Sequence, residues 1–198
     1  MPACRPEAQG PATPPAANWF LTLPLPPGSG WERAAAGAPP ELRRFDPLDL
    51  HLTVAFLGPC GEAAALAAWG AVAPRRQGAI PATAGGWRAM GPAAAPSAYA
   101  LGLDRGAPEL AELLAIWGPP ALAAAGRPAE RRAPLPHVTL LRPRRRDGQR
   151  LREPMARWMA AAPLPSDPVT FSEIALYTWN PDRRERLFRI QARRPLAG

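Results

Sequence analysis

Short apolar runs, each closed by proline or glycine, recur along the chain. Residues 19–25 form one such run before Pro26-Pro27-Gly28, and residues 50–57, partly β-branched, form another before Gly58-Pro59. A short apolar run bounded by turn-forming residues is typical of a strand. The same criterion predicts further strands over residues 80–90, 97–103, 136–141, 169–177 and 186–192.

Between these runs, apolar residues repeat at helical spacing. Leu66 and Trp69 lie three positions apart in an alanine-rich stretch and predict a helix over residues 62–73. A leucine and tryptophan pattern predicts another over residues 108–125, which Gly118-Pro119-Pro120 must interrupt or kink. Shorter helices are expected over residues 30–36 and 151–161, the second after a charged loop at 144–150.

The order of these elements predicts the fold class. Strand, helix and strand pair occur twice, which indicates an α+β protein of two lobes related by internal pseudo-symmetry. At 198 residues the chain can bury most of its apolar surface without disulfides or metals. We expect one bilobal domain over residues 18–198, preceded by a disordered tail rich in proline and alanine at 1–17.

One polar pattern stands out because it occurs in two of the predicted strands. His51-Leu52-Thr53 and His137-Val138-Thr139 contain the only two histidines of the chain. Residues i and i+2 of a strand project from the same face, so each histidine shares a face with its threonine. If the lobes face each other, two imidazoles and two hydroxyls line one cleft.

This set of groups suits cleavage of a phosphodiester. Two histidines can act as general base and general acid, and threonine hydroxyls can donate to the non-bridging phosphate oxygens. Neither step requires a metal or a cofactor, and we expect none. Alternatively, each histidine is structural and bonds a backbone carbonyl, and the threonines are ordinary strand formers. The two motifs are nearly equivalent, so either histidine could be the base.

Charge and cysteine content add little that is specific. The formal net charge is +8, and every basic residue is arginine. Guanidinium groups suit phosphate and favour an anionic partner such as RNA, although complete arginine use can equally reflect genome composition. Cys4 and Cys60 lack metal spacing and are expected to be free thiols. We find no signal peptide and no apolar run long enough to cross a membrane, and we expect a cytoplasmic protein. We also expect it to be a monomer.

The two motifs and their surroundings resemble a known family. Residues 50–58 and 136–142 are similar to the paired motifs of bacterial RNA 2′,3′-cyclic phosphodiesterases, earlier named 2′-5′ RNA ligases, in the two-histidine phosphoesterase superfamily. The resemblance extends to residues 19–25 and 171–177 and covers about residues 18–196.

The resemblance implies two antiparallel sheets flanking a cleft, with helices outside. It implies hydrolysis of an RNA 2′,3′-cyclic phosphate to a 2′-phosphate, and in some members 2′-5′ joining of RNA ends. His51, Thr53, His137 and Thr139 match the catalytic positions, and Arg142 matches an arginine that contacts phosphate or nucleotide. The substrate-stacking aromatics are expected among Phe20, Trp87, Tyr177 and Trp179, with core packing as the alternative for Phe20 and Tyr177.

Other readings stay open at the level of sequence. The tail and the Arg144-Arg145-Arg146 run depart from the family pattern, and the run is either a solvated loop or a contact to the RNA backbone. The substrate is either an RNA end or a small cyclic or 2′-5′ linked nucleotide. An interpretation from another class is a non-catalytic RNA-binding module.

Overall fold

The computed structural model describes residues 16–72, 78–144, 147–184 and 186–196. The predicted tail falls almost entirely outside the described residues, as do Cys4, Arg145 and Arg146. The helices are α1 (Glu62–Ala71), α2 (Ala107–Ala124) and α3 (Gly148–Ala161), with short 3-10 helices η1 (Trp31–Ala35) and η2 (Pro47–Asp49). The strands are β1 (Trp19–Pro24), β2 (Leu42–Arg44), β3 (His51–Gly58), β4 (Ile80–Ala82), β5 (Ala84–Met90), β6 (Ala98–Leu103), β7 (His137–Pro143), β8 (Val169–Phe171), β9 (Glu173–Trp179) and β10 (Phe188–Pro195).

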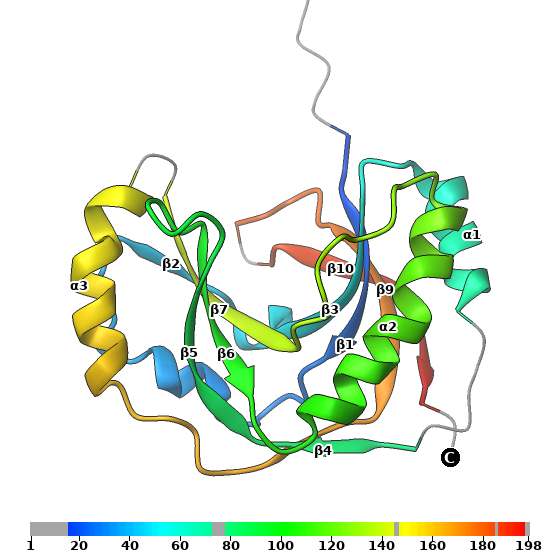
Figure 1. Ribbon diagram of the computed structural model, residues 1–198. Coiled ribbons are helices and arrows are strands. Elements are labelled where there is room, and N and C mark those ends of the chain that lie inside the picture. The colour runs from blue at the N-terminus through cyan, green and yellow to red at the C-terminus, as the bar shows by residue number, and fades with distance from the viewer. Residues whose placement is uncertain (1–15, 73–77, 145–146, 185, 197–198) are drawn as a thin grey trace, which may run out of the picture.

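The strands form one main sheet that is nearly divided in two. Its order is β10-β9-β1-β3-β7-β6-β5, β2 also pairs with β7, and β4 and β8 form a separate two-stranded sheet. All pairings are antiparallel, and β3 joins β7 through the single pair Leu52 and Val138. In Figure 1, α1 and α2 cover the lobe of β1, β3, β9 and β10, and α3 covers the lobe of β5, β6 and β7. The bilobal α+β fold predicted from the sequence is confirmed. The two halves of the main sheet, one in each lobe, are joined at that one pair.

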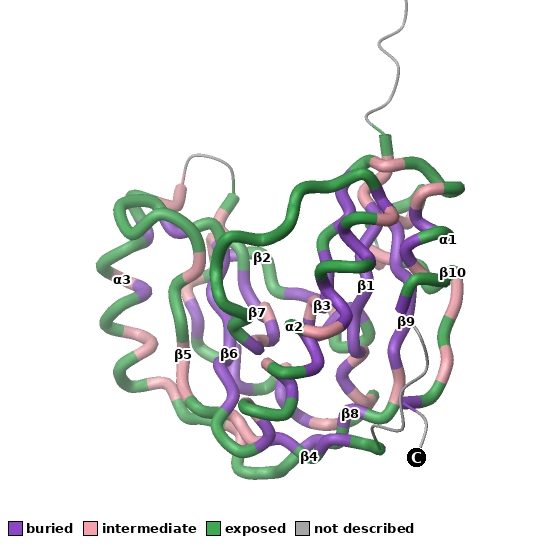
Figure 2. The backbone as a smooth tube through the Cα atoms, turned by 45° about the vertical axis from the view of Figure 1, so that its right-hand side comes forward, coloured by how far each residue is buried: buried purple, intermediate pink, exposed green. Residues whose placement is uncertain are grey.

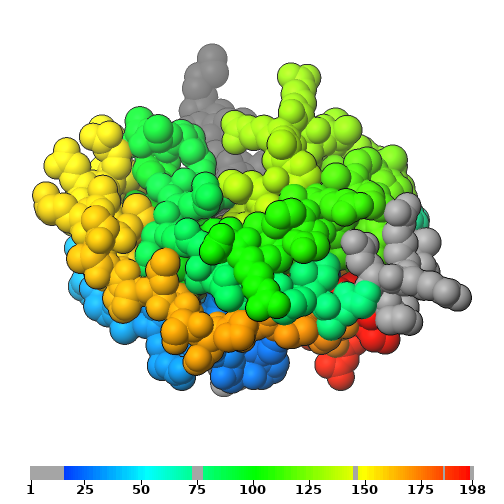
Figure 3. Space-filling model, turned by 60° about the horizontal axis from the view of Figure 1, so that its bottom comes forward, coloured from blue at the N-terminus to red at the C-terminus, as the bar shows by residue number. Residues whose placement is uncertain are grey.

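The lobes are interleaved along the chain, which the sequence pattern did not predict. Strand β2 comes early in the chain but pairs with β7, and α2 follows β6 yet packs on β3 and α1 in the other lobe. The segment from α3 to β8 returns across the base of the molecule, where Figure 3 shows it as an orange band. A simple order of first lobe and then second lobe is therefore wrong.

Helix α2 continues through Pro119 and Pro120. The sequence predicted an interruption or a kink at this point, and the interruption is wrong. Both prolines are exposed, and the carbonyl groups that lose their helical partners belong to Ala115 and Ile116. Water can reach exposed backbone on this side of the helix. The opposite side packs into the core through fully or nearly fully buried residues, including Leu110, Leu113, Trp117 and Ala121.

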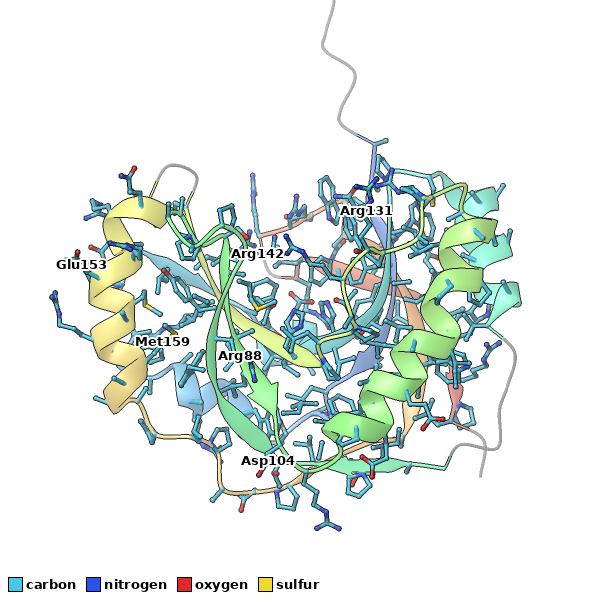
Figure 4. All side chains as sticks on the ribbon, in the orientation of Figure 1. Arg88, Asp104, Arg131, Arg142, Glu153 and Met159 are labelled. Atoms are coloured by element: carbon cyan, nitrogen blue, oxygen red, sulfur yellow. The ribbon has the colours of Figure 1, made fainter. Side chains whose placement is uncertain are left out.

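The remaining differences are local. Strand β2, Leu-Arg-Arg, was not predicted, α3 begins inside the expected charged loop, and the run at 80–90 divides into β4 and β5 at Thr83. Thr83 leaves the ladder because its backbone pairs instead with the turn at Asp104 and Arg105. In α3, Met159 points toward β5 and Glu153 away from it (Figure 4).

The core lies between the helices and the sheet. Figure 2 shows β1, β6, β7 and β9 largely buried, whereas the connection from α2 to β7 is exposed throughout residues 126–135. Within the described ranges, no helix combines the length and the apolar character needed to cross a bilayer.

Candidate active site

The four motif side chains lie on one face where the two lobes meet. His51 and Thr53 of β3, and His137 and Thr139 of β7, are each partly exposed. Leu52 and Val138, which alternate with them, are fully buried on the other side. The alternation expected from the sequence therefore turns the polar groups outward and anchors both strands in the core.

The register between β3 and β7 sets how the two motifs meet. Leu52 pairs with Val138, so in these antiparallel strands His51 lies next to Thr139, and Thr53 next to His137. Each imidazole is thus beside the hydroxyl of the other motif. The two rings are also close enough for a charge on His137 to lower the pKa of His51.

Both rings make the same hydrogen bond. Nδ1 of His51 lies 2.7 Å from the carbonyl oxygen of Asp49, and Nδ1 of His137 lies 2.6 Å from that of Leu135. Because a carbonyl only accepts, Nδ1 carries the proton in each neutral ring and Nε2 keeps a free lone pair. The hydrogen bond from each histidine to a backbone carbonyl, which was the alternative structural role of these residues, is therefore present. It leaves Nε2 of both histidines available for proton transfer.

His51 sits on aromatic side chains. Its ring centroid is 5.1 Å from that of Phe20, 5.4 Å from Phe188 and 5.6 Å from Tyr177. Burial against these rings lowers the pKa of His51 to about 4, and nearby Arg142 and His137 contribute in the same direction. His51 is therefore a neutral imidazole near pH 7, in the state required of a base.

The position of Phe20 corrects one sequence expectation. Phe20 is 4% exposed and packs with Tyr177 and Ala175, so it offers no free face for a base to stack on. Its role is to remove water from one side of His51. The alternative of core packing, which the sequence left open for Phe20 and Tyr177, is the one that the structure shows.

Asp49 anchors the segment that precedes His51. Its side chain is 1% exposed, and its carboxylate accepts hydrogen bonds from Nε of Arg186 at 3.1 Å and from the backbone N–H of Leu187 at 2.7 Å. The same arginine donates to the carbonyl oxygen of Leu48 at 2.9 Å. This network ties the start of β3 to the chain before β10, and so holds the carbonyl that orients His51. Sequence reasoning missed Asp49 because nothing local marks its distant partner.

A matching irregularity follows each threonine. Thr53 pairs with Thr22 and Ala55 with Leu21, which leaves Val54 as an extra residue in β3. In β7, Leu140 is the extra residue between the pairs Thr139–Ala100 and Leu141–Tyr99. A bulge of this kind shifts the alternation by one residue, so the next side chains to return to the site face are Phe56 and Arg142. Both are exposed.

Arg142, one of the substrate-binding residues predicted from the sequence, lies near His51. Figure 4 shows it in the space between the two lobes. Its guanidinium carbon is 5.8 Å from the ring centre of Phe45, and its charge reaches His51. Trp179, which we expected to stack on substrate, is the last residue of β9 and is partly exposed. The guanidinium carbon of Arg183 lies 4.3 Å from the centre of its ring. Trp87 of β5 packs against Trp158 of α3, with ring centroids 4.8 Å apart.

On the other side of the histidines lies an apolar pocket of about 500 Å³. Thr53, Phe56 and His137 contribute to its wall, and α2 and the exposed loop before β7 close it. An apolar cavity with a few polar groups at one end is the usual form of a small-molecule site. In the part of the chain that the structure describes, no three His, Cys, Asp or Glu side chains gather closely enough to hold a metal ion.

Comparison with known proteins shows the fold through solved structures alone. No family model matches the chain, and no curated protein matches it. A crystal structure described as a phosphoesterase aligns with a TM-score of 0.69 at 24% identity, covering 92% of this chain and 99% of its own. The chain therefore shares the fold of this structure.

Among the structures with this fold, E. coli LigT recurs. Its complex with 3′-AMP has a TM-score of 0.68 at 21% identity and covers 91% of this chain and 98% of its own. A protein of Thermus thermophilus has a TM-score of 0.62 at 19% identity, with 91% and 98% covered. The chain is LigT-like in fold over nearly its whole described length.

Proposed function

We propose that this protein is a phosphodiesterase that opens RNA 2′,3′-cyclic phosphate ends to 2′-phosphates by paired-histidine acid–base catalysis without a metal. One observation carries the proposal. Each histidine commits Nδ1 to a backbone carbonyl, which leaves two Nε2 atoms on one face beside two threonine hydroxyls. The LigT-like fold, found in structures described as a phosphoesterase and as LigT complexed with 3′-AMP, supports it.

The reaction needs one group that removes a proton and one that supplies a proton. His51, neutral because burial lowers its pKa to about 4, takes a proton from water at Nε2 as the water oxygen bonds to phosphorus. The bond from phosphorus to the ribose 3′ oxygen breaks, and Nε2 of His137 protonates that oxygen. The base and the acid belong to different strands, related by pseudo-symmetry, and so can act on opposite sides of one phosphorus.

The remaining groups act on the phosphate itself. Thr53 and Thr139 can donate to the two non-bridging oxygens, where negative charge grows in the transition state. Arg142 supplies a cation next to them. The apolar pocket beside His137 provides a wall for the ribose and base of the terminal nucleotide. A ribose hydroxyl in place of water would join two RNA ends by the same steps.

Product analysis tests the proposal directly. An oligonucleotide ending in a 2′,3′-cyclic phosphate is incubated with the protein and a chelator, and the expected product ends in a 2′-phosphate. His51→Ala and His137→Ala should each remove turnover while far-UV circular dichroism stays unchanged. A double alanine variant with full activity would refute the mechanism. RNA binding with no product from the wild type would favour the binding-module interpretation.

A further inference from the structure

The strongest feature outside the proton-transfer groups is a cluster of three arginines. In the register of β2 and β7, Arg43 lies directly opposite Arg142. Nη2 of Arg43 donates to the carbonyl oxygen of Arg183 at 3.4 Å, and the Arg183 side chain lies over Trp179. Three segments far apart in the sequence thus bring three guanidinium groups to one place.

Among the residues that the structure describes, the cluster has no carboxylate partner. Elsewhere, Arg33, Arg150, Arg152 and Arg186 each lie 3.1 to 3.9 Å from a carboxylate oxygen. Over the ranges 16–72, 78–144, 147–184 and 186–196, no carboxylate comes that close to Arg43, Arg142 or Arg183. Like charges directly opposite each other on paired strands destabilise a sheet.

The lowered pKa values of Arg142 and Arg183 also indicate that like charges are gathered here. Loss of water around Arg142 lowers its pKa, and the charges of Arg43 and Arg183 lower it further. The pKa of Arg183 is lowered by burial and by Arg43. A fold that gathers like charges at an exposed position is stabilised when an anion binds there.

Two carboxylates close to Arg43 already have hydrogen-bond partners. Asp49 is held by Arg186 and Leu187, and Asp46 accepts a hydrogen bond from the backbone N–H of Leu48. Next to Arg43, these residues line a hollow of about 250 Å³ together with other side chains, including Arg44 and Arg184. The wall of the hollow holds three arginines and two carboxylates, and it adjoins the cluster at Arg43, because Arg142 and Arg183 do not line it.

The cluster begins at the reaction centre and extends away from it. Arg142 lowers the pKa of His51, and Arg43 and Arg183 lie beside Arg142, on β2 and on the segment after β9. On the His137 side, the equivalent of Arg142 is Phe56, which lines the apolar pocket. The site therefore has an apolar end and a cationic end.

From this geometry we infer that Arg43 and Arg183, next to Arg142, form a second phosphate site, which binds a phosphate of the substrate other than the one that reacts. The inference rests on the proposed function and narrows its substrate class. A nucleoside 2′,3′-cyclic phosphate has one phosphate and leaves this site empty. An RNA end carries a further phosphate on the 5′ side of its last nucleotide, and a planar guanidinium fork is suited to such a group.

The test compares two nucleotides that differ by one phosphate. Adenosine 2′,5′-bisphosphate and adenosine 2′-monophosphate are titrated into the full chain by calorimetry at fixed salt. We expect the bisphosphate to bind at least tenfold more tightly. Arg43→Gln and Arg183→Gln should each reduce this ratio about fivefold. Both side chains are exposed, so folding should be unaffected.

A matched control removes the same charge elsewhere. Arg105 is exposed and follows Asp104, which Figure 4 places at the base of the molecule, below Arg142, so Arg105→Gln should leave the ratio unchanged. Equal affinity of the wild type for both nucleotides would overturn the inference, as would an equal loss for both in the two variants. Because binding is measured without turnover, a protein that hydrolyses no cyclic phosphate refutes the proposed function separately.

Discussion

Strands β3 and β7 have the same local arrangement around their histidine and threonine. Each presents a histidine and a threonine on one face, fixes Nδ1 of its histidine with the carbonyl two residues earlier, and bulges directly after the threonine. The two motifs are therefore equivalent in these three respects. This equivalence is why the sequence alone could not tell base from acid.

The surroundings of the two strands differ. Phe56 in β3 takes the place that Arg142 has in β7, and the carbonyl that orients His51 belongs to buried Asp49, whereas that for His137 belongs to exposed Leu135. Aromatic rings enclose His51, while His137 borders an open pocket. The two strands thus share a local geometry, and under the proposed function their different surroundings assign different roles to the two histidines.

The largest expected difference is between Arg142 and its counterpart Phe56. Removing a cation that meets developing charge costs about 100- to 1,000-fold in rate. We expect Arg142→Gln to lower kcat/KM on a cyclic-ended oligonucleotide by about that factor, and Phe56→Gln by about tenfold or less, in steady-state assays. Equal losses would mean that the two ends of the site are not distinct.

The second comparison is between Asp49 and Leu135. Asp49→Asn keeps the carbonyl and the shape of the side chain but leaves the Arg186 charge without its partner. Because the Arg186 side chain is 33% exposed and can reach water, losing this half-buried ion pair should cost about 2 kcal/mol of unfolding free energy. Leu135 is 44% exposed, so Leu135→Ala should cost about 0.5 kcal/mol or less. Urea unfolding measures both, and a stability of Asp49→Asn close to wild type would contradict the anchoring role.

The third comparison asks whether the two hydroxyls are equivalent. Thr53→Val and Thr139→Val each remove one donor to the phosphate while keeping the β-branched shape. Each should lower kcat by about 10- to 100-fold, the effect of losing one hydrogen bond in the transition state. Thr53→Ser and Thr139→Ser serve as controls and should stay within a few-fold of wild type. A large loss at one position alone would show that only one threonine touches the phosphate.

The smallest expected effect concerns the protonation of His51. An imidazole has a pKa of about 6.5 in the unfolded chain, and folding lowers that of His51 to about 4. The unfolded state therefore takes up a proton first as the pH falls. His51 should remove about 1 kcal/mol of stability between pH 7 and pH 5.5, an effect that His51→Gln lacks.

Proton NMR checks the same shift directly. The chain has two histidines, so each single His→Gln variant leaves one imidazole signal and assigns it. The signal of His51 should titrate near pH 4 and not near its ordinary value. A midpoint close to 6.5 would remove the argument that His51 is the base.

Much of the fold was accessible from sequence because local patterns are strong where one face of an element is buried. The runs at 19–25 and 50–57 became β1 and β3, and the helices at 62–73 and 108–125 became α1 and α2. Strand β2 has three residues, two of them exposed arginines, and carries no such pattern. Its pairing with β7 decides where Arg43 lies, so the cationic cluster could not be predicted.

The sequence by itself determined that each His-x-Thr motif presents its histidine and threonine on one face, because side chains alternate along a strand. Only the tertiary structure decided what surrounds them. The pairing of Leu52 with Val138, the rings around His51, the anchor at Asp49 and the opposition of Arg43 to Arg142 join residues distant along the chain. Such contacts depend on register and burial between strands, and no local pattern encodes them.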